Sequence, residues 1–268
     1  MVIIGNKFEI KKCLGEGSFG KVYEGINIRS NDQVAIKMEA LNTDICTLKY
    51  ETKIYQYLNG TLGVPILKWY GCDQNYRYMV INLLKLSLSD LIDQNHYLSL
   101  QNTLEIGIYI IQILKSIHEK GLIHRDIKPN NFLFGTGDNQ NKLYLIDYGM
   151  CKKYVTNTGD HILPKNINNI LGSLNYCSIN NHNLIEPSRR DDLESVGYIL
   201  IYLLNGNLIW EKIRSPSIIK ERKEVLTKDI KIPGIHDIII TYLKYIRGLE
   251  FSENPNYDWI IELFSSQL

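Results

Sequence analysis

The stretch His124-Arg125-Asp126-Ile127-Lys128-Pro129-Asn130-Asn131 decides how the rest of this sequence is interpreted. It brings charged residues, a proline and two asparagines into one short segment, at spacings that are hard to obtain by chance. Pro129 disfavours a helical conformation at Lys128, the residue before it. The segment therefore predicts a polar loop that presents a carboxylate, an ammonium and an amide together.

These side chains are the ones that phosphoryl transfer requires. Asp126 would accept the proton of an attacking hydroxyl and orient its oxygen for in-line attack. Lys128 would touch the transferred phosphate and offset its charge, and Asn131 would hold a magnesium ion. We therefore interpret the segment as a catalytic loop.

A glycine-rich run, Gly15-Glu16-Gly17-Ser18-Phe19-Gly20, lies near the N-terminus. Glycines let the backbone come close to phosphates and point its amides at them. A dinucleotide-binding loop would be followed by a helix, whereas Lys21 to Gly25 has the pattern of a strand. The context predicts a hairpin that covers phosphates, and a simple glycine turn is the alternative.

Lys37 ends the apolar strand Val34-Ala35-Ile36. An ammonium there is costly unless it meets an anion, such as a nucleotide phosphate or a carboxylate. We expect its partner to be Glu51, on the helix that follows. Glu39 competes, but it lies in the same strand as Lys37. A lysine that only reaches the surface from a strand end is the alternative.

A second carboxylate, Asp147, follows the apolar strand Leu143 to Ile146 and begins the turn Asp147-Tyr148-Gly149. An aspartate at a strand end can chelate Mg²⁺ that bridges phosphates. Such a turn is ordinary by itself. It becomes evidence for a metal site because it follows Asn131 at a spacing that a β-hairpin would span. Glycine loop, lysine, helix glutamate, catalytic loop and metal aspartate thus occur in the order of a protein kinase.

The predicted fold class is α+β, with two lobes. Residues 1–84 read mostly as strands, interrupted by a helix from Asp44 to Leu58, and form a small lobe that includes the start of a hinge near Asn82 to Lys85. Residues 85–268 read as a larger helical lobe, and both lobes belong to one functional domain. The predicted helices of the second lobe run from Ser99 to Gly121, from Asp191 to Asn205, from Gly234 to Leu249 and from Tyr257 to Phe264.

Bulk composition excludes several classes of protein. The chain has 268 residues and a net charge of +1, which gives no basic field for nucleic acid. Its five cysteines are dispersed, so we expect neither disulfides nor a zinc site, and an intracellular location in cytoplasm or nucleus. The longest apolar run, Val196 to Leu204, is too short for a membrane span. We expect a monomer.

The cluster Lys220 to Lys223 is interpreted as a solvated helix face; a nuclear signal and a basic patch are the alternatives.

The chain resembles the casein kinase 1 superfamily over essentially its whole length. Ser178-Ile179-Asn180 and the segment Ser188 to Ser195 carry the resemblance. The turn Asp147-Tyr148-Gly149 and Gly172-Ser173-Leu174 are similar to vaccinia-related kinases.

The resemblance implies an active serine/threonine protein kinase that uses ATP and Mg²⁺ on protein substrates. Lys128 stands two residues after Asp126, as in serine/threonine kinases. Leu14 would pack over adenine, Ile81 would be the gatekeeper, and Leu84 would offer its backbone to adenine. Asp90 would lie near the ribose, and Asp192 would brace the catalytic loop. The full set of nucleotide contacts implied is Leu14, Gly15, Gly17, Ser18, Gly20, Val22, Ala35, Lys37, Ile81, Leu84, Asp90 and Leu133.

Three positions depart from the family pattern. Lys85 replaces a glycine after the hinge leucines, and the hinge exit is expected to be stiffer. Asn175 and Asn168 replace an arginine and a lysine, although Lys165 keeps a positive charge near Asn168. Because asparagine cannot form a charge-assisted bidentate pair, we expect a weaker preference for phosphorylated substrates. We also expect activity without phosphorylation of the activation segment, as in the family.

Two other functions compete with this interpretation. A non-catalytic scaffold would keep the fold and bind nucleotide or partners, but Lys37, Asp126 and Asp147 are intact. A small-molecule kinase of related fold is the other, and Ser178-Ile179-Asn180 argues against it.

Overall fold

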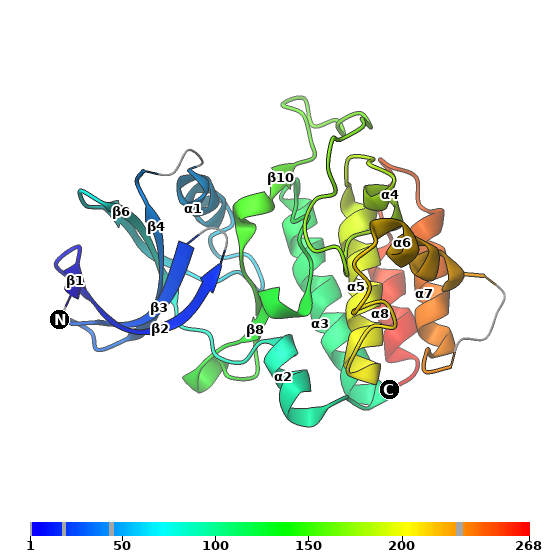
Figure 1. Ribbon diagram of the computed structural model, residues 1–268, viewed down its shortest axis with the longest axis horizontal. Helices are drawn as coiled ribbons and strands as arrows, with labels where there is room; N and C mark the ends of the chain where they lie inside the picture. Colours follow the sequence, from blue (N-terminus) through cyan, green and yellow to red (C-terminus); the bar gives the residue numbers. More distant parts are fainter. Residues whose placement is uncertain (1, 18–19, 43–45, 229–232) are drawn as a thin grey trace. The chain divides into compact units, whose positions relative to one another are not determined.

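The computed structural model describes residues 2–17, 20–42, 46–228 and 233–268 (Figure 1). The chain divides into two compact units. The first comprises Met1–Leu86 and Leu133–Gly149, and the second comprises Ser87–Phe132 and Met150–Leu268. The first unit is built around a β-sheet and the second around α-helices, which is an α+β arrangement.

The first unit contains a six-stranded antiparallel sheet in the order β1-β2-β3-β4-β6-β5. Its strands are β1 (Val2–Ile4), β2 (Phe8–Gly17), β3 (Gly20–Asn27), β4 (Gln33–Ala40), β5 (Leu67–Cys72) and β6 (Tyr76–Asn82). Side chains alternate between the two faces along each strand. One face carries a buried cluster that includes Phe8, Val34, Ile36 and Val80. Ala35 and Lys37, between and beyond these residues on β4, therefore belong to the other face.

The described glycines of the glycine-rich run, Gly15, Gly17 and Gly20, lie in the β2–β3 hairpin. Gly17 pairs with Gly20, and β3 continues as a strand, so the predicted hairpin context is confirmed. Gly20 has a φ of +128°, and a Cβ there would overlap the carbonyl oxygen of Met38. Only glycine fits this position without strain. Ser18, a predicted nucleotide contact, lies outside the described residues.

One helix, α1 (Thr47–Tyr57), belongs to the first unit. Asp44, the predicted start, lies outside the described residues, and the helix ends at the C-cap Leu58, as predicted. Its buried side chains include Leu48, Glu51 and Tyr55, so a carboxylate is buried among apolar groups.

The first unit is completed by a short hairpin. Its elements are β8 (Phe132–Phe134), the 3-10 helix η2 (Gly137–Asn139) and β9 (Leu143–Leu145), and the 3-10 helix η3 (Tyr148–Met150) follows them. Main-chain hydrogen bonds join Phe134 to Lys85 and Leu86. These bonds explain why residues 133–149 group with the sheet.

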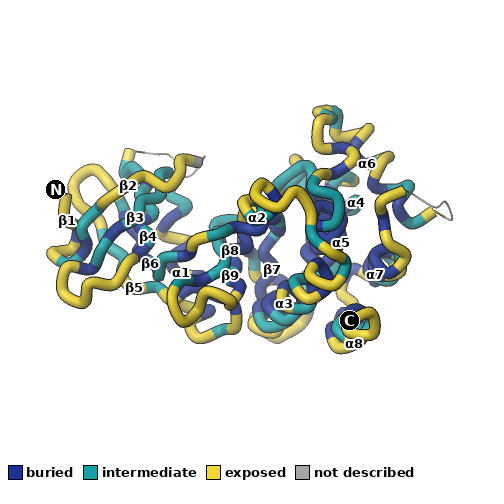
Figure 2. The backbone as a smooth tube through the Cα atoms, turned by 90° about the horizontal axis from the view of Figure 1, so that it is seen from below, coloured by how far each residue is buried: buried dark blue, intermediate teal, exposed yellow. Residues whose placement is uncertain are grey.

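The second unit is helical and is organised around α5 (Arg189–Asn205), which packs against α3 and α7. The other elements are α2 (Leu88–Asn95), α3 (Leu100–Glu119), β7 (Leu122–Ile123), η1 (Pro129–Asn131), β10 (Lys152–Lys153), α4 (Ile179–His182), α6 (Pro216–Val225), α7 (Asp237–Gly248) and α8 (Tyr257–Ser265). Figure 2 shows α5 largely in the colour of buried residues, and its side chains from Asp191 to Leu203 are all buried. The predicted central buried helix is confirmed.

Local signals set the helix ends of this unit. The Ser99 side chain accepts a hydrogen bond from Asn102 N–H and caps α3, as predicted. The predicted stop at Gly121 is confirmed by its φ of +76°, one residue beyond the C-cap Lys120. No helix among the described residues is both long and apolar enough to cross a membrane.

Candidate active site

Three charged side chains meet within the first unit. The Lys37 ammonium on β4 lies 2.7 Å from Glu51 Oε2 on α1 and 3.0 Å from Asp147 Oδ1, after β9. The predicted contact between Lys37 and Glu51 is present. Glu39 points elsewhere, since its carboxylate bonds the first turn of α1 and Arg77.

Electrostatics fix the ionisation of Lys37. Its burial opposes the charged form, but the carboxylates of Glu51 and Asp147 outweigh this effect and raise the pKa of Lys37 above its ordinary value. The side chain therefore remains a cation at neutral pH. Glu51 is only 1% exposed, so this cation is its main compensation for burial.

The turn that carries Asp147 is held in an unusual conformation. Asp147 has a φ of +68°, in the left-handed region that few non-glycine residues adopt. The next residue, Tyr148, is fully buried and packs edge-on against Tyr55 of α1, with ring centroids 4.9 Å apart. This packing couples the position of Asp147 to that of α1, as does the ion pair through Lys37.

One face of the sheet gathers several predicted nucleotide contacts. Directly paired residues of antiparallel strands point to the same face. The register pairs Gly15 with Val22, Val22 with Lys37, and Ala35 with Ile81. These five positions therefore share the face opposite the buried cluster.

The remaining predicted contacts differ in their surroundings. Leu14 is 49% exposed and Leu84 is buried. Main-chain hydrogen bonds engage Lys85 N–H, and the Thr136 hydroxyl donates to Leu83 O. Between them, the Leu84 main chain makes no hydrogen bond to the described part of the chain. Leu133 lies half-buried on β8.

Asp90 has a structural role that the sequence did not suggest. It is exposed in the first turn of α2, and its Oδ2 accepts hydrogen bonds from the Ser87 N–H and hydroxyl. Ser87 Oγ in turn accepts from Asp90 N–H, which completes a capping box.

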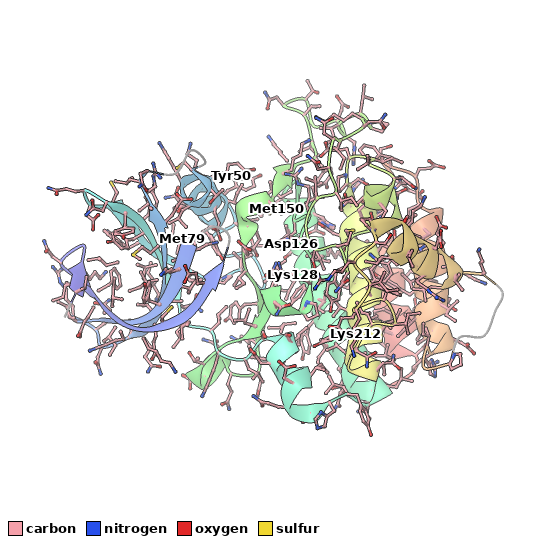
Figure 3. All side chains as sticks on the ribbon, in the orientation of Figure 1. Tyr50, Met79, Asp126, Lys128, Met150 and Lys212 are labelled. Carbon is pink, nitrogen blue, oxygen red and sulfur yellow. The ribbon has the colours of Figure 1, made fainter. Side chains whose placement is uncertain are left out.

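The second unit holds the loop around Asp126, labelled with Lys128 in Figure 3. Lys128 Nζ lies 2.6 Å from Asp126 Oδ2, and Ser173 N–H donates to Asp126 Oδ1 over 2.9 Å. The Asn131 amide nitrogen donates to the Asp126 carbonyl over 2.8 Å. Lys128 itself is extended, as predicted from Pro129. Lys128 and the Ser173 amide thus bind the Asp126 carboxylate, and the Asn131 amide binds the main chain of the same residue.

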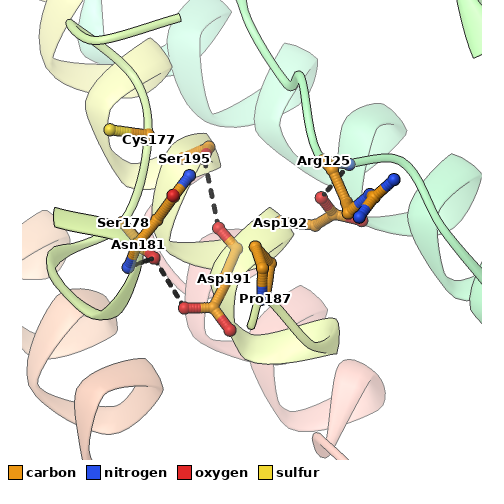
Figure 4. A pocket seen from close by; sticks show the side chains of 8 residues that line it. All are labelled: Arg125, Cys177, Ser178, Asn181, Pro187, Asp191, Asp192 and Ser195. Atoms are coloured by element: carbon orange, nitrogen blue, oxygen red, sulfur yellow. Dashed lines mark hydrogen bonds between the residues drawn. The ribbon is translucent and has the colours of Figure 1, made fainter. Parts of the chain in front are cut away.

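A buried carboxylate supports this loop from α5. Asp192 accepts hydrogen bonds from the main-chain N–H groups of His124 (2.7 Å) and Arg125 (2.8 Å), and lies 3.1 Å from His118 Nε2. Arg125 has a φ of +70°, so the bonds hold a strained backbone. Figure 4 shows Asp192 beneath Arg125 at the edge of a small cavity. The predicted brace is present.

Residues 8–254 match the family model of the protein kinase domain. The match spans most of the chain. The chain belongs to the protein kinase domain family. Its α+β architecture, with a strand-rich unit and a helical unit, is the bilobal fold of that family, and its activity class is phosphoryl transfer by a protein kinase.

In this kinase Arg125, in the predicted catalytic loop, is occupied by internal partners. Arg125 Nε donates to the Met150 carbonyl over 2.7 Å, and its Nη1 lies 3.3 Å from Glu186 Oε1. Glu186 is 2% exposed and also pairs with Lys152 (2.9 Å) and Lys165 (3.7 Å). A carboxylate of the chain itself thus sits among three cations, and the sequence analysis did not single it out.

The segment before Ser178 is fixed by α6 and the loop that precedes it. Trp210 Nε1 donates to the Asn175 carbonyl over 2.9 Å. The Lys223 ammonium is fully buried and donates to the carbonyls of Leu174 and Cys177. The interpretation of Lys220 to Lys223 as a solvated face is therefore wrong for Lys223, because its charge is satisfied by inward-facing carbonyls.

The contact of Ser173 with Asp126 was not predicted from the sequence. Its neighbour Gly172 has a φ of +72°, and a Cβ there would lie 2.5 Å from Arg125 O and 3.0 Å from Asp126 Oδ1. Glycine lets this segment approach the catalytic loop closely enough for the Ser173 amide to reach Asp126. A glycine next to a serine was the only available signal.

Proposed function

We propose that this kinase transfers the γ-phosphate of ATP to serine and threonine hydroxyls of protein substrates. The single observation that carries the proposal is the 2.6 Å contact between Lys128 Nζ and Asp126 Oδ2. A lysine at this position is typical of kinases that act on serine and threonine. It places a positive charge beside the carboxylate that would receive the hydroxyl proton.

Each residue of the loop has a distinct role in this proposal. Asp126 is the base and orients the acceptor hydroxyl, with its other oxygen held by Ser173 N–H. Lys128 stabilises charge that develops on the transferred group. Lys37, kept cationic by Glu51, contacts the phosphates of the nucleotide.

Two side chains near the proposed catalytic groups, Asn131 and Asp147, also suit Mg²⁺. This ion neutralises the phosphates and prefers oxygen ligands. Asn131 directs its amide nitrogen at the Asp126 carbonyl, which leaves the amide oxygen for a metal. Asp147 is a carboxylate at a strand end. No group of three or more His, Cys, Asp or Glu that could hold a metal exists among the described residues. Protein kinases need none, because phosphate oxygens and waters complete the shell.

The nucleotide itself would lie on the shared sheet face described above, opposite the buried cluster of the first unit. The unpaired main chain of Leu84 supplies a donor and an acceptor for adenine. We propose residues 1–84 and 85–268 as the two lobes of one functional domain. The proposed contacts are Leu14, Gly15, Gly17, Ser18, Gly20, Val22, Ala35, Lys37, Ile81, Leu84, Asp90 and Leu133.

We also propose that the kinase is similar to casein kinase 1 and is active without prior phosphorylation. Support for the second point comes from Glu186, which neutralises Arg125 from within the chain. A phosphate on the activation segment would find Arg125 already paired with this carboxylate.

The test is a peptide-array phosphorylation assay with Mg²⁺ and ATP. Wild type is compared with Asp126→Ala, Lys128→Met and the exposed control Asp138→Asn. We expect phosphate on serine and threonine peptides, at least a 100-fold loss in Asp126→Ala, and wild-type activity in the control.

Other outcomes would favour the competing functions. Nucleotide binding without transfer to any peptide would favour a scaffold. Transfer confined to tyrosine peptides would contradict the serine/threonine assignment.

A further inference from the structure

Glu39 is a buried carboxylate with no part in the chemistry proposed above. It lies on β4, two residues after Lys37, and is 4% exposed. Its Oε1 accepts three hydrogen bonds, from Thr47 N–H (2.9 Å), the Thr47 hydroxyl (2.7 Å) and Leu48 N–H (3.0 Å). A strand residue thus caps the N-terminus of α1.

Within the part of the chain that the structure describes, the helix has no local substitute for this cap. Cys46 occupies the N-cap position and makes no side-chain cap hydrogen bond, and the first turn of α1 has no acidic residue. The first amides of a helix have no partner within the helix, and an anion is favoured there. Glu39 provides both the acceptor and the charge.

The carboxylate is in turn fixed by the sheet. Its Oε2 lies 3.3 Å from Arg77 Nη1, and Arg77 is the direct neighbour of Glu39 in the β4–β6 register. A buried carboxylate needs such partners, because an unpaired buried charge is costly. The cap is therefore attached to the same rigid sheet that carries Lys37.

Glu51 follows Thr47 by one helical turn. Strand β4 thus holds α1 at two points, through Glu39 at the first turn and through Lys37 at Glu51. We propose that Glu39 is a positioning residue, which holds α1 in the register where Glu51 reaches Lys37. The inference rests on the proposed kinase function, because the register matters only if Lys37 contacts a nucleotide.

The experiment measures kcat and the KM for ATP in Glu39→Ala, with the exposed Glu105→Ala as a matched control. We expect kcat to fall about tenfold, which lies within the range of helix-cap contributions expressed as an equilibrium constant. The control should match wild type. If Glu39→Ala does not fold, Glu39→Gln takes its place, with a smaller expected loss of about threefold, because the amide keeps one acceptor.

Two combined variants separate positioning from general stability. Cys46→Asp adds a local cap, so in the Glu39→Ala background it should restore kcat to within about threefold of wild type. In a Glu51→Gln background, Glu39→Ala should add little further loss, because both act through one contact.

Three results would overturn the inference. They are an unchanged kcat in Glu39→Ala, a loss that Cys46→Asp does not reverse, and losses that multiply in the Glu51→Gln background. A wild-type protein with no transfer to serine or threonine peptides would instead contradict the proposed function, so the two failures are distinguishable.

Discussion

The Lys223 ammonium donates a hydrogen bond to the Cys177 carbonyl over 2.7 Å, inside the second unit. Lys223 is fully buried, and it also contacts the Leu174 carbonyl (2.9 Å) and His182 Nε2 (3.1 Å). Its charge faces the rings of Tyr198 and Trp210 as well. Because Ser178 follows directly, this buried lysine holds the segment that leads to the Ser178–Asn180 motif.

Because Lys223 is buried, the free energy of unfolding should change with pH in the alkaline range. Burial lowers the pKa of Lys223 to about 8, against the effects of the Cys177 thiol and Glu194. A lysine whose folded pKa is lowered costs stability below that pKa, and the cost is relieved as pH rises toward its unfolded value of about 10.5.

We therefore expect the melting temperature of wild type, relative to Lys223→Met, to increase between pH 8 and 10. Thermal unfolding at several pH values measures this difference. Ionisation of groups remote from Lys223 is common to both proteins and cancels. A difference that stays constant with pH would show that Lys223 does not titrate in this range.

The brace from Asp192 should be essential for both folding and catalysis. In Asp192→Asn an NH₂ group replaces one of the two carboxylate oxygens, so the main-chain N–H of either His124 or Arg125 loses its acceptor. An unsatisfied buried donor costs about 1–3 kcal/mol, so we expect the free energy of unfolding to fall by roughly this amount. Activity should fall at least tenfold, because the backbone of Arg125 is strained and needs the support. Urea unfolding and kcat measure the two effects, and the exposed Asp93→Asn is the control.

Asn175 should limit recognition of phosphorylated substrates. We expect wild type to phosphorylate a peptide with an upstream phosphoserine and its unmodified version with similar kcat/KM. Asn175→Arg should raise the kcat/KM for the phosphorylated peptide about tenfold relative to that for the unmodified peptide. The reason is that arginine forms charge-assisted bidentate pairs with phosphate. The gain should shrink at high salt. Asn175→Gln is the matched neutral control. A strong preference for the primed peptide in wild type would refute the prediction.

Glu186 should make activity independent of phosphorylation. Phosphatase treatment of wild type is expected to leave kcat unchanged. Glu186→Ala removes the carboxylate from among Arg125, Lys152 and Lys165, and should lower kcat about tenfold. Added sulfate should restore part of the kcat of Glu186→Ala by binding between the same three cations. Loss of wild-type activity after phosphatase treatment would contradict this account.

The sequence predicted the parts of this protein that are local. The glycine hairpin, the extended Lys128 before Pro129, the cap at Ser99 and the stop at Gly121 depend on a few adjacent residues, whose backbone preferences are strong. The proposed catalytic loop is equally local, since Asp126, Lys128 and Asn131 lie within six positions. The pairing of Lys37 with Glu51 could also be predicted, because Glu51 lies on the helix that follows, whereas the competing Glu39 lies in the same strand as Lys37.

Only the tertiary structure revealed the partners of the charged residues that stand outside the sequence motifs. Glu39, Glu186 and Lys223 are ordinary surface residues by pattern, and each is buried by partners distant in sequence or by main-chain groups. Hydrogen bonds to main-chain amides and carbonyls leave no signal in side-chain composition. The sequence by itself therefore determined the kinase chemistry that we propose, through residues close together in the chain. Folding determined which buried charges hold that chemistry in place, because burial makes an unpaired charge too costly to keep.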